Sequence, residues 1–199
     1  MSSLMDLVTS QLGGNLPDLS KALGTDEKQT GQAVSMALPA ILGALSRNAS
    51  QSDGAQSLTT ALSRDHDGSI LSNVAGFLNS GDTTTGDGIL KHVLGSKRSR
   101  VEAGVSQGSG LDPATVTKLM TTLAPLVMGM LGKAQRENQL DANAMAGMLD
   151  SGRKEFESRD PQAAGLLSNL LDTDGDGDLD LGDMAKHGSG LLGKFLGGK

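Results

Sequence analysis

The sequence predicts an all-α fold, a compact bundle of short helices, and three observations favour it. Apolar residues recur at intervals of three and four along most of the chain, which is the spacing of one helix face. Glycine ends many of these apolar segments, and Asp, Asn or Pro starts them. The 199 residues include no Trp, no Tyr and only three Phe, so we expect a core of Leu, Met, Val, Ile and Ala.

The expected helices of the first half follow these start and stop signals. In chain order they cover residues 2–12, 17–23, about 26–47, about 54–63, a stretch that ends at Leu78, and 86–95. Pro39 lies inside the third helix and is expected to bend or split it near Ala37. A turn of sequence DHDGSIL (65–71) and a polar loop over 80–86 separate the later helices.

The second half of the sequence repeats the pattern of the first. A shift of 86 positions places Gly24 on Gly110, Asp26 on Asp112, Pro39 on Pro125, Gly43 on Gly129, and Ala33, Val34, Ala37, Ile41 and Leu45 on Leu119, Met120, Leu123, Val127 and Leu131. The segment 86–95 (GDGILKHVLG) matches 188–197 (GSGLLGKFLG) at a shift of 102, which implies about sixteen inserted residues around 150–166. We therefore expect two duplicated halves, 1–96 and 97–199. The basic cluster 97–100 (KRSR) is interpreted as a solvated linker.

One segment of the second half, 172–183 (DTDGDGDLDLGD), resembles the calcium loop of EF-hand and dockerin-type modules. The acids at loop positions 1, 3, 5, 7, 9 and 12 are Asp172, Asp174, Asp176, Asp178, Asp180 and Asp183. Gly177 at position 6 permits the sharp reversal, and Leu179 at position 8 anchors the loop to a core. We expect a side-chain ligand from each acid except two: Asp178 supplies its backbone carbonyl, and Asp180 binds directly or through water.

Two departures from the EF-hand pattern predict weak calcium binding. Asp183 stands where the EF-hand usually has Glu, so its shorter carboxylate reaches the ion less well, and no second complete loop is present. We expect a Kd of about 10⁻⁴–10⁻³ M. A shift of 109 places a second, incomplete loop in the first half, with Asp65, Asp67, Gly68 and Ile70 on Asp174, Asp176, Gly177 and Leu179. Two ligand positions are lost there, so no calcium is expected, and whether the turn of Asp65 and Asp67 holds any ion stays open.

The duplicated Pro-containing helices, the DHDGSIL turn and the GDGILKHVLG segment together resemble the YidB-like family of bacterial domains of unknown function. The resemblance covers most of the chain and is most specific at the turn and the segment after it. It implies a compact all-helical fold. From this resemblance together with the repeat and the acidic segment, we expect two YidB-like halves, 1–96 and 97–199, with the EF-hand-like loop 172–183 in the second. The resemblance implies no catalytic residues, because the family has no established activity or substrate.

The charge distribution and the length of the apolar runs limit which partners the protein is expected to have. The net charge is −6, and the six aspartates of 172–183 account for it, since the rest of the chain carries 17 acids and 17 bases. We expect no nucleic-acid surface and no transmembrane segment, because the longest apolar runs are short and contain Pro39 and Pro125. The N-terminus lacks a signal-peptide pattern, which predicts a cytoplasmic location, with secretion without a signal as the alternative.

The residues that could carry catalysis are few. The chain has no cysteine, no nucleophile elbow, no P-loop and no H-E-x-x-H motif, and its histidines, His66, His92 and His187, are scattered. His66 is expected to be an exposed turn residue whose flanking acids, Asp65 and Asp67, raise its pKa. We therefore expect no enzyme.

Two functions are compatible with these patterns. The first is a non-enzymatic calcium-binding helical module, in which the ion orders the C-terminal loop and the following helix, for interaction with a protein partner. The alternative is a self-assembling or membrane-surface protein with no functional metal. Its motive is the C-terminal apolar stripe of Leu191, Leu192, Phe195 and Leu196 beside Lys194 and Lys199.

Overall fold

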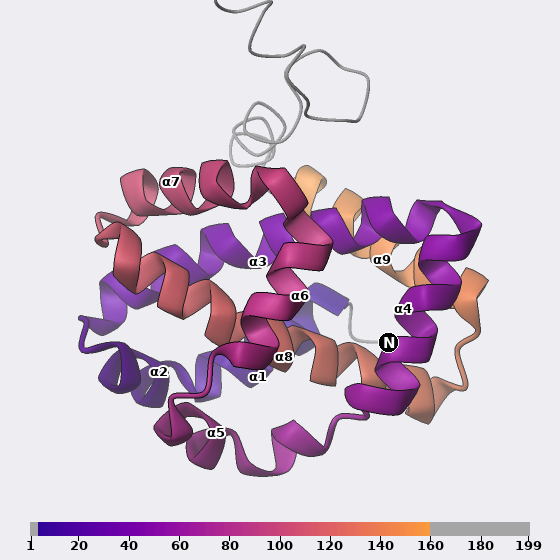
Figure 1. Cartoon of the computed structure of the whole chain (residues 1–199), viewed down its shortest axis with the longest axis horizontal. Helices are drawn as coiled ribbons and strands as arrows, with labels where there is room; N and C mark the ends of the chain where they lie inside the picture. The colour runs from indigo at the N-terminus through magenta and orange to yellow at the C-terminus, as the bar shows by residue number, and fades with distance from the viewer. Residues whose placement is uncertain (1–3, 160–199) are drawn as a thin grey trace, which may run out of the picture.

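A computed structural model describes residues 4–159 of the chain, and within that range the ordered elements are all helical (Figure 1). The fold class predicted from the sequence, all-α, is therefore confirmed for these residues. The helices are α1 (Leu4–Gly14), α2 (Leu16–Leu23), α3 (Glu27–Ser50), α4 (Ser52–Asp65), η1 (Ser69–Asn73), α5 (Val74–Ser80), α6 (Thr84–Leu94), η2 (Gly95–Lys97), α7 (Arg98–Ser109), α8 (Pro113–Asn138) and α9 (Ala142–Arg159).

The two longest helices, α3 and α8, run through the middle of the molecule, and the shorter helices surround them (Figure 1). Helix α3 contacts α4, α6, α7, α8 and α9, while α8 also contacts α4, α6 and α7. The two long helices begin in the same way. Asp26 and Asp112 are their N-caps, and each aspartate side chain accepts a hydrogen bond from a backbone N–H of the first turn.

The expected break at Pro39 does not split the third helix, because α3 runs from Glu27 to Ser50 without interruption. Helix α8 likewise continues across Pro125. Both prolines are buried, and the residues around Pro39, such as Leu38 and Ile41, are packed in the core. Packing on several sides therefore holds the helix together where the proline removes one backbone hydrogen bond.

Two sequence-based boundaries in the middle of the chain are wrong. Helix α6 begins at Thr84, inside the segment expected to be a loop. The basic cluster 97–100 is no solvated linker, because Arg98 starts α7 and its side chain is only 20% exposed. The reason is tertiary: Arg98 is held by acids on α6 and α7, which a local pattern does not reveal.

A single apolar core unites the described residues of both expected halves. It includes Ile41 and Leu45 of α3, Leu90 of α6, Leu123 of α8 and Leu149 of α9, all almost fully buried. All five apolar pairs that the shift of 86 positions superimposes lie in this core. Helices α3 and α8 therefore contribute many of the core residues, which pack mainly against the shorter helices around them.

Helix α8 is the one described helix that is long and apolar enough to cross a bilayer by length and composition. However, 72% of its most apolar window is buried inside the protein. This pattern is typical of the central helix of a bundle, whose apolar side chains are already covered by its neighbours.

Candidate functional site

The six predicted calcium ligands, Asp172, Asp174, Asp176, Asp178, Asp180 and Asp183, lie outside the described residues. The structure therefore describes the body that precedes the loop. Within residues 4–159, no group of three or more His, Cys, Asp or Glu side chains is placed to hold a metal ion.

The turn 65–71, whose sequence aligns with the predicted calcium loop, lies within the described residues, and both of its carboxylates have partners. Asp65 accepts hydrogen bonds from Arg64, with 2.7 Å between Arg64 Nη2 and Asp65 Oδ2, and these bonds hold the pKa of its carboxyl below the usual range. Asp67 Oδ1 accepts from the backbone N–H of Ser69 at 2.9 Å, which lowers the pKa of Asp67. Arg136 of α8 lies 3.7 Å from the other oxygen of Asp67. Both carboxylates of the turn are therefore paired with groups of the protein itself.

Three glycines seat this turn on α8. Gly68 has a φ of 92°, a left-handed conformation that favours glycine, and a Cβ there would lie 2.8 Å from Lys133 Cβ. On α8, a Cβ at Gly129 would lie 2.5 Å from Ile70 Cγ2, and one at Gly132 would lie 1.7 Å from the His66 carbonyl oxygen. The turn therefore packs directly on α8, and the two backbones approach each other more closely than side chains at these three positions would permit.

The structure corrects the expectation for His66. The imidazole is half-buried rather than exposed, and burial lowers its pKa, while the nearby charge of Asp65 opposes this shift without reversing it. The flanking acids do not dominate, because Arg64 binds Asp65 and the backbone of Ser69 binds Asp67. Desolvation of the charged imidazole decides the direction.

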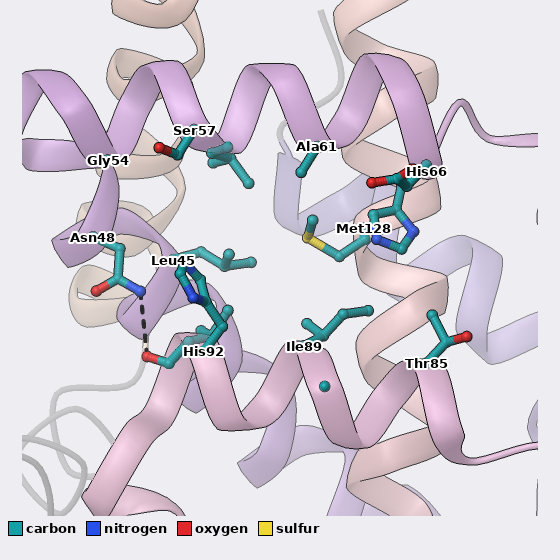
Figure 2. A pocket seen from close by; sticks show the side chains of 14 residues that line it. Leu45, Asn48, Gly54, Ser57, Ala61, His66, Thr85, Ile89, His92 and Met128 are labelled. Carbon is teal, nitrogen blue, oxygen red and sulfur yellow. Dashed lines mark hydrogen bonds between the residues drawn. The ribbon is translucent and has the colours of Figure 1, made fainter.

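His66 lies at one end of a cleft of about 560 Å³ between α4 and α6, with α3 and α8 as its floor (Figure 2). His92 of α6 lies toward the other end, and Met128 of α8 and Ile89 of α6 lie between the two imidazoles (Figure 2). The Asn48 side chain closes one side by donating a hydrogen bond of 3.3 Å to the Val93 carbonyl. The lining is mostly apolar, so the cleft provides shape and apolar contact, with few groups that could take part in proton transfer.

A charged network that the sequence did not reveal lies where α6, α7 and α8 meet. The Arg98 guanidinium donates to Asp87 Oδ1 at 2.6 Å and to Glu102 Oε1 at 2.7 Å. The other oxygen of Glu102 accepts from the Thr117 hydroxyl of α8 at 3.0 Å. The spacing of Arg98 and Glu102 at i,i+4 was a signal for this pair, and the link to Asp87 depends on the fold. The network fixes α6 against α7.

The family model for a bacterial protein of unknown function (DUF937) matches residues 6–134. The chain is a DUF937 protein. The expectation of a bacterial domain of unknown function is thereby confirmed. No curated protein and no solved structure matches the chain significantly.

The DUF937 match covers most of the described body. It runs from α1 into the last turns of α8, and it includes the turn 65–71, the cleft-lining residues and the Arg98 network. It also crosses position 96, where the two expected halves meet. Helix α9 and the segment 172–183 lie beyond the matched residues. The acidic loop is therefore a feature that this DUF937 protein carries outside the matched region.

Proposed function

We propose that this DUF937 protein is a non-enzymatic calcium-binding module, in which the ion orders the C-terminal loop and the segment that follows it for interaction with a protein partner. The observation that carries the proposal is the spacing of the six aspartates in 172–183, with glycine at loop position 6 and leucine at position 8. Oxygen ligands at alternate positions of a tight turn are what calcium requires.

Electrostatics gives the loop its mechanism. Six carboxylates within twelve residues repel one another, and this repulsion favours an extended loop in the absence of a cation. A divalent ion gathers the oxygens and offsets part of the charge. Binding is therefore coupled to ordering of the loop. The short Asp183 carboxylate and the lack of a second complete loop keep the proposed affinity weak, at a Kd of about 10⁻⁴–10⁻³ M.

The arrangement of the helices supports the further proposal that the chain arose by duplication of a YidB-like half. Gly24 and Gly110 both adopt the left-handed conformation, two residues before the aspartates that cap α3 and α8. Each of these helices then continues across a buried proline. The same glycine, capping aspartate and buried proline at positions separated by 86 residues are expected if both helices derive from one ancestral unit.

Isothermal titration with calcium tests the proposed function directly. We expect saturable heat from the wild-type chain and no heat from Asp172→Ala, which removes the ligand at loop position 1. Asp18→Ala, a change of an exposed acid on α2, is the matched control and should bind calcium as the wild type does. Equal heats from wild type and Asp172→Ala would remove the proposal.

The second candidate function is self-assembly or membrane-surface attachment, motivated by the apolar stripe of Leu191, Leu192, Phe195 and Leu196 beside two lysines. Sedimentation at several protein concentrations, with and without anionic liposomes, distinguishes it from the calcium module. A monomer that stays in the supernatant throughout is the result expected for the calcium module. Co-sedimentation with liposomes in the presence of chelator would favour the second function instead.

A further inference from the structure

Two equivalent glycines on the two central helices differ in what covers them. Gly129 of α8 is buried, and a Cβ there would lie 2.5 Å from Ile70 of the turn 65–71. Gly43 of α3 lies 86 positions earlier, is half-buried, and has no atom within 4 Å of an added Cβ. The face of α3 at Gly43 thus has no described counterpart of the turn that seats on α8.

A second pair of equivalent positions shows the same contrast. Thr121 of α8 is 3% exposed, because Gly86 at the start of α6 presses on its carbonyl, where an added Cβ would be 1.7 Å away. Ser35 of α3, again 86 positions earlier, is exposed. The two places on α8 that the turn and α6 cover therefore both have more open counterparts on α3.

The segment of the chain that corresponds to the turn and to α6 is the one that carries the acidic loop. Leu179 aligns with Ile70 and Gly177 with Gly68, and residues 188–197 align with 86–95. We propose that the loop 172–183 docks on α3 over Gly43, as the turn 65–71 docks on α8 over Gly129, with Leu179 at the place of Ile70. This inference rests on the calcium-loop function and the duplication proposed above, and it adds the surface that receives the loop.

The chain is long enough for this docking. Helix α9 is described as far as Arg159 and packs against α3. The residues between Arg159 and Asp172 can span up to roughly 40 Å when extended. Helix α3, with 24 residues, is about 36 Å long. The connecting segment is therefore long enough to span a distance comparable with the length of α3.

Charge favours the same surface. Arg47 lies one turn after Gly43 on α3, and together with His92 and Lys97 it lines a hollow of about 320 Å³. A segment with six aspartates is attracted to the positive charges of Arg47 and Lys97. At the equivalent place on α8, Lys133 borders Gly68, so Arg47 is expected to border Gly177.

Disulfide trapping tests the docking, because the chain contains no cysteine. In the full chain, the pair Gly43→Cys and Leu179→Cys should form a disulfide under mild oxidation in calcium. The Gly147→Cys and Leu179→Cys pair is the matched control, since Gly147 is an exposed helical glycine with equally open space. We expect cross-linking at position 43 to be at least about tenfold faster than at position 147, because docking raises the effective concentration of the two thiols.

A second pair, Ser35→Cys with Gly188→Cys, tests the docking independently and should also cross-link. Ser35 is exposed, so we expect the substitution there to leave the fold intact.

Calcium titration of the same reduced variants distinguishes the two proposals. Calcium heat together with equal cross-linking rates at positions 43 and 147 would overturn the docking and leave the calcium function intact. Selective cross-linking at position 43 without calcium heat would support the docking and remove the calcium function. If the variants show no calcium heat and no faster cross-linking at position 43, both the calcium function and the docking are overturned.

Discussion

The carbonyl oxygen of His66 lies against Gly132 of α8, where a Cβ at position 132 would be 1.7 Å from it. The Leu62 carbonyl oxygen is also near, at 3.3 Å from the same point. Backbone oxygens cannot turn aside as the end of a long side chain can, so glycine is the residue that fits. This contact sets the distance between the end of α4 and α8, and with it the position of the turn 65–71.

The change Gly132→Ala should lower the free energy of unfolding. The added methyl group gains roughly 1 kcal/mol of helix propensity, but it forces α4 and the turn away from α8. Such overpacking costs about 1–3 kcal/mol, and more where the backbone must shift, so we expect a net loss of stability. Urea unfolding followed by circular dichroism measures it.

The matched control for this change is Gly147→Ala on the exposed face of α9. A Cβ there meets no atom within 4 Å, so the propensity gain of up to about 1 kcal/mol should appear undiminished. If Gly132→Ala stabilises the protein as Gly147→Ala does, the close approach of His66 to Gly132 is wrong.

The half-buried imidazole of His66 should make stability depend on pH. Burial lowers its folded pKa below the usual value of about 6.5, so the unfolded chain takes up a proton that the folded protein does not. The free energy of unfolding should therefore fall as the pH is lowered from about 6.5 through the lower folded pKa. Urea unfolding between about pH 8 and pH 5 should show a smaller decline for His66→Gln than for wild type.

A direct titration checks the same cause. The ring C–H resonances of His66, assigned by their loss in His66→Gln, should report an apparent pKa below about 6.5. A value at or above it would mean that the flanking acids outweigh burial, as the sequence alone suggested.

The helix starts show how much of the fold the sequence could predict. The third helix was expected to start at about residue 26, and Asp26 caps α3, because capping depends on residues within one turn. Asp112, which the shift of 86 positions pairs with Asp26, caps α8 in the same way. The start of α7 at Arg98 was missed for the opposite reason. Its basic residues resemble a linker until Asp87 of α6, which is 11 residues earlier, supplies a partner.

The candidate sites differ in the same way, since one depends on local sequence and the other on the tertiary fold. The calcium loop is a prediction from spacing within twelve residues, and it needs no knowledge of the fold. The cleft beside His66 could not be predicted, because its lining residues come from four helices and are spread along the chain from Leu45 to Met128. The pKa of His66 was predicted in the wrong direction, since its sequence neighbours are visible in the chain while the atoms that bury it are not.

The Arg98 network should be worth more than an exposed ion pair. Arg98→Met keeps most of the side-chain volume but leaves Glu102, which is 16% exposed, without its charged partner. We expect a loss of about 1–3 kcal/mol in unfolding free energy, the penalty for leaving a largely buried polar group unpaired. Arg136→Met is the control, because that arginine is 63% exposed and should contribute little.

A double-mutant cycle separates charge from packing in this network. Glu102→Gln removes the charge that Arg98→Met leaves unpaired, so the double variant should recover part of the lost stability. Additive losses from the two changes would show that Arg98 contributes through packing alone.

Thermal melts in calcium, magnesium and chelator connect the loop to the body of the protein. If the ion binds the folded chain alone, calcium at ten times its Kd should add about 1.4 kcal/mol to stability and raise Tm. Magnesium should raise it less, because it demands octahedral geometry and gives up its water reluctantly. Asp172→Ala should abolish the calcium shift, while Asp18→Ala, which changes an exposed acid on α2, should retain it.

A calcium-induced rise in Tm also requires that the calcium-bound loop contacts the helical body, since an ion held by an independent tail leaves the body's unfolding unchanged. Titration heat without a Tm shift would therefore place the ion on the loop and deny it any role in holding the loop to α3.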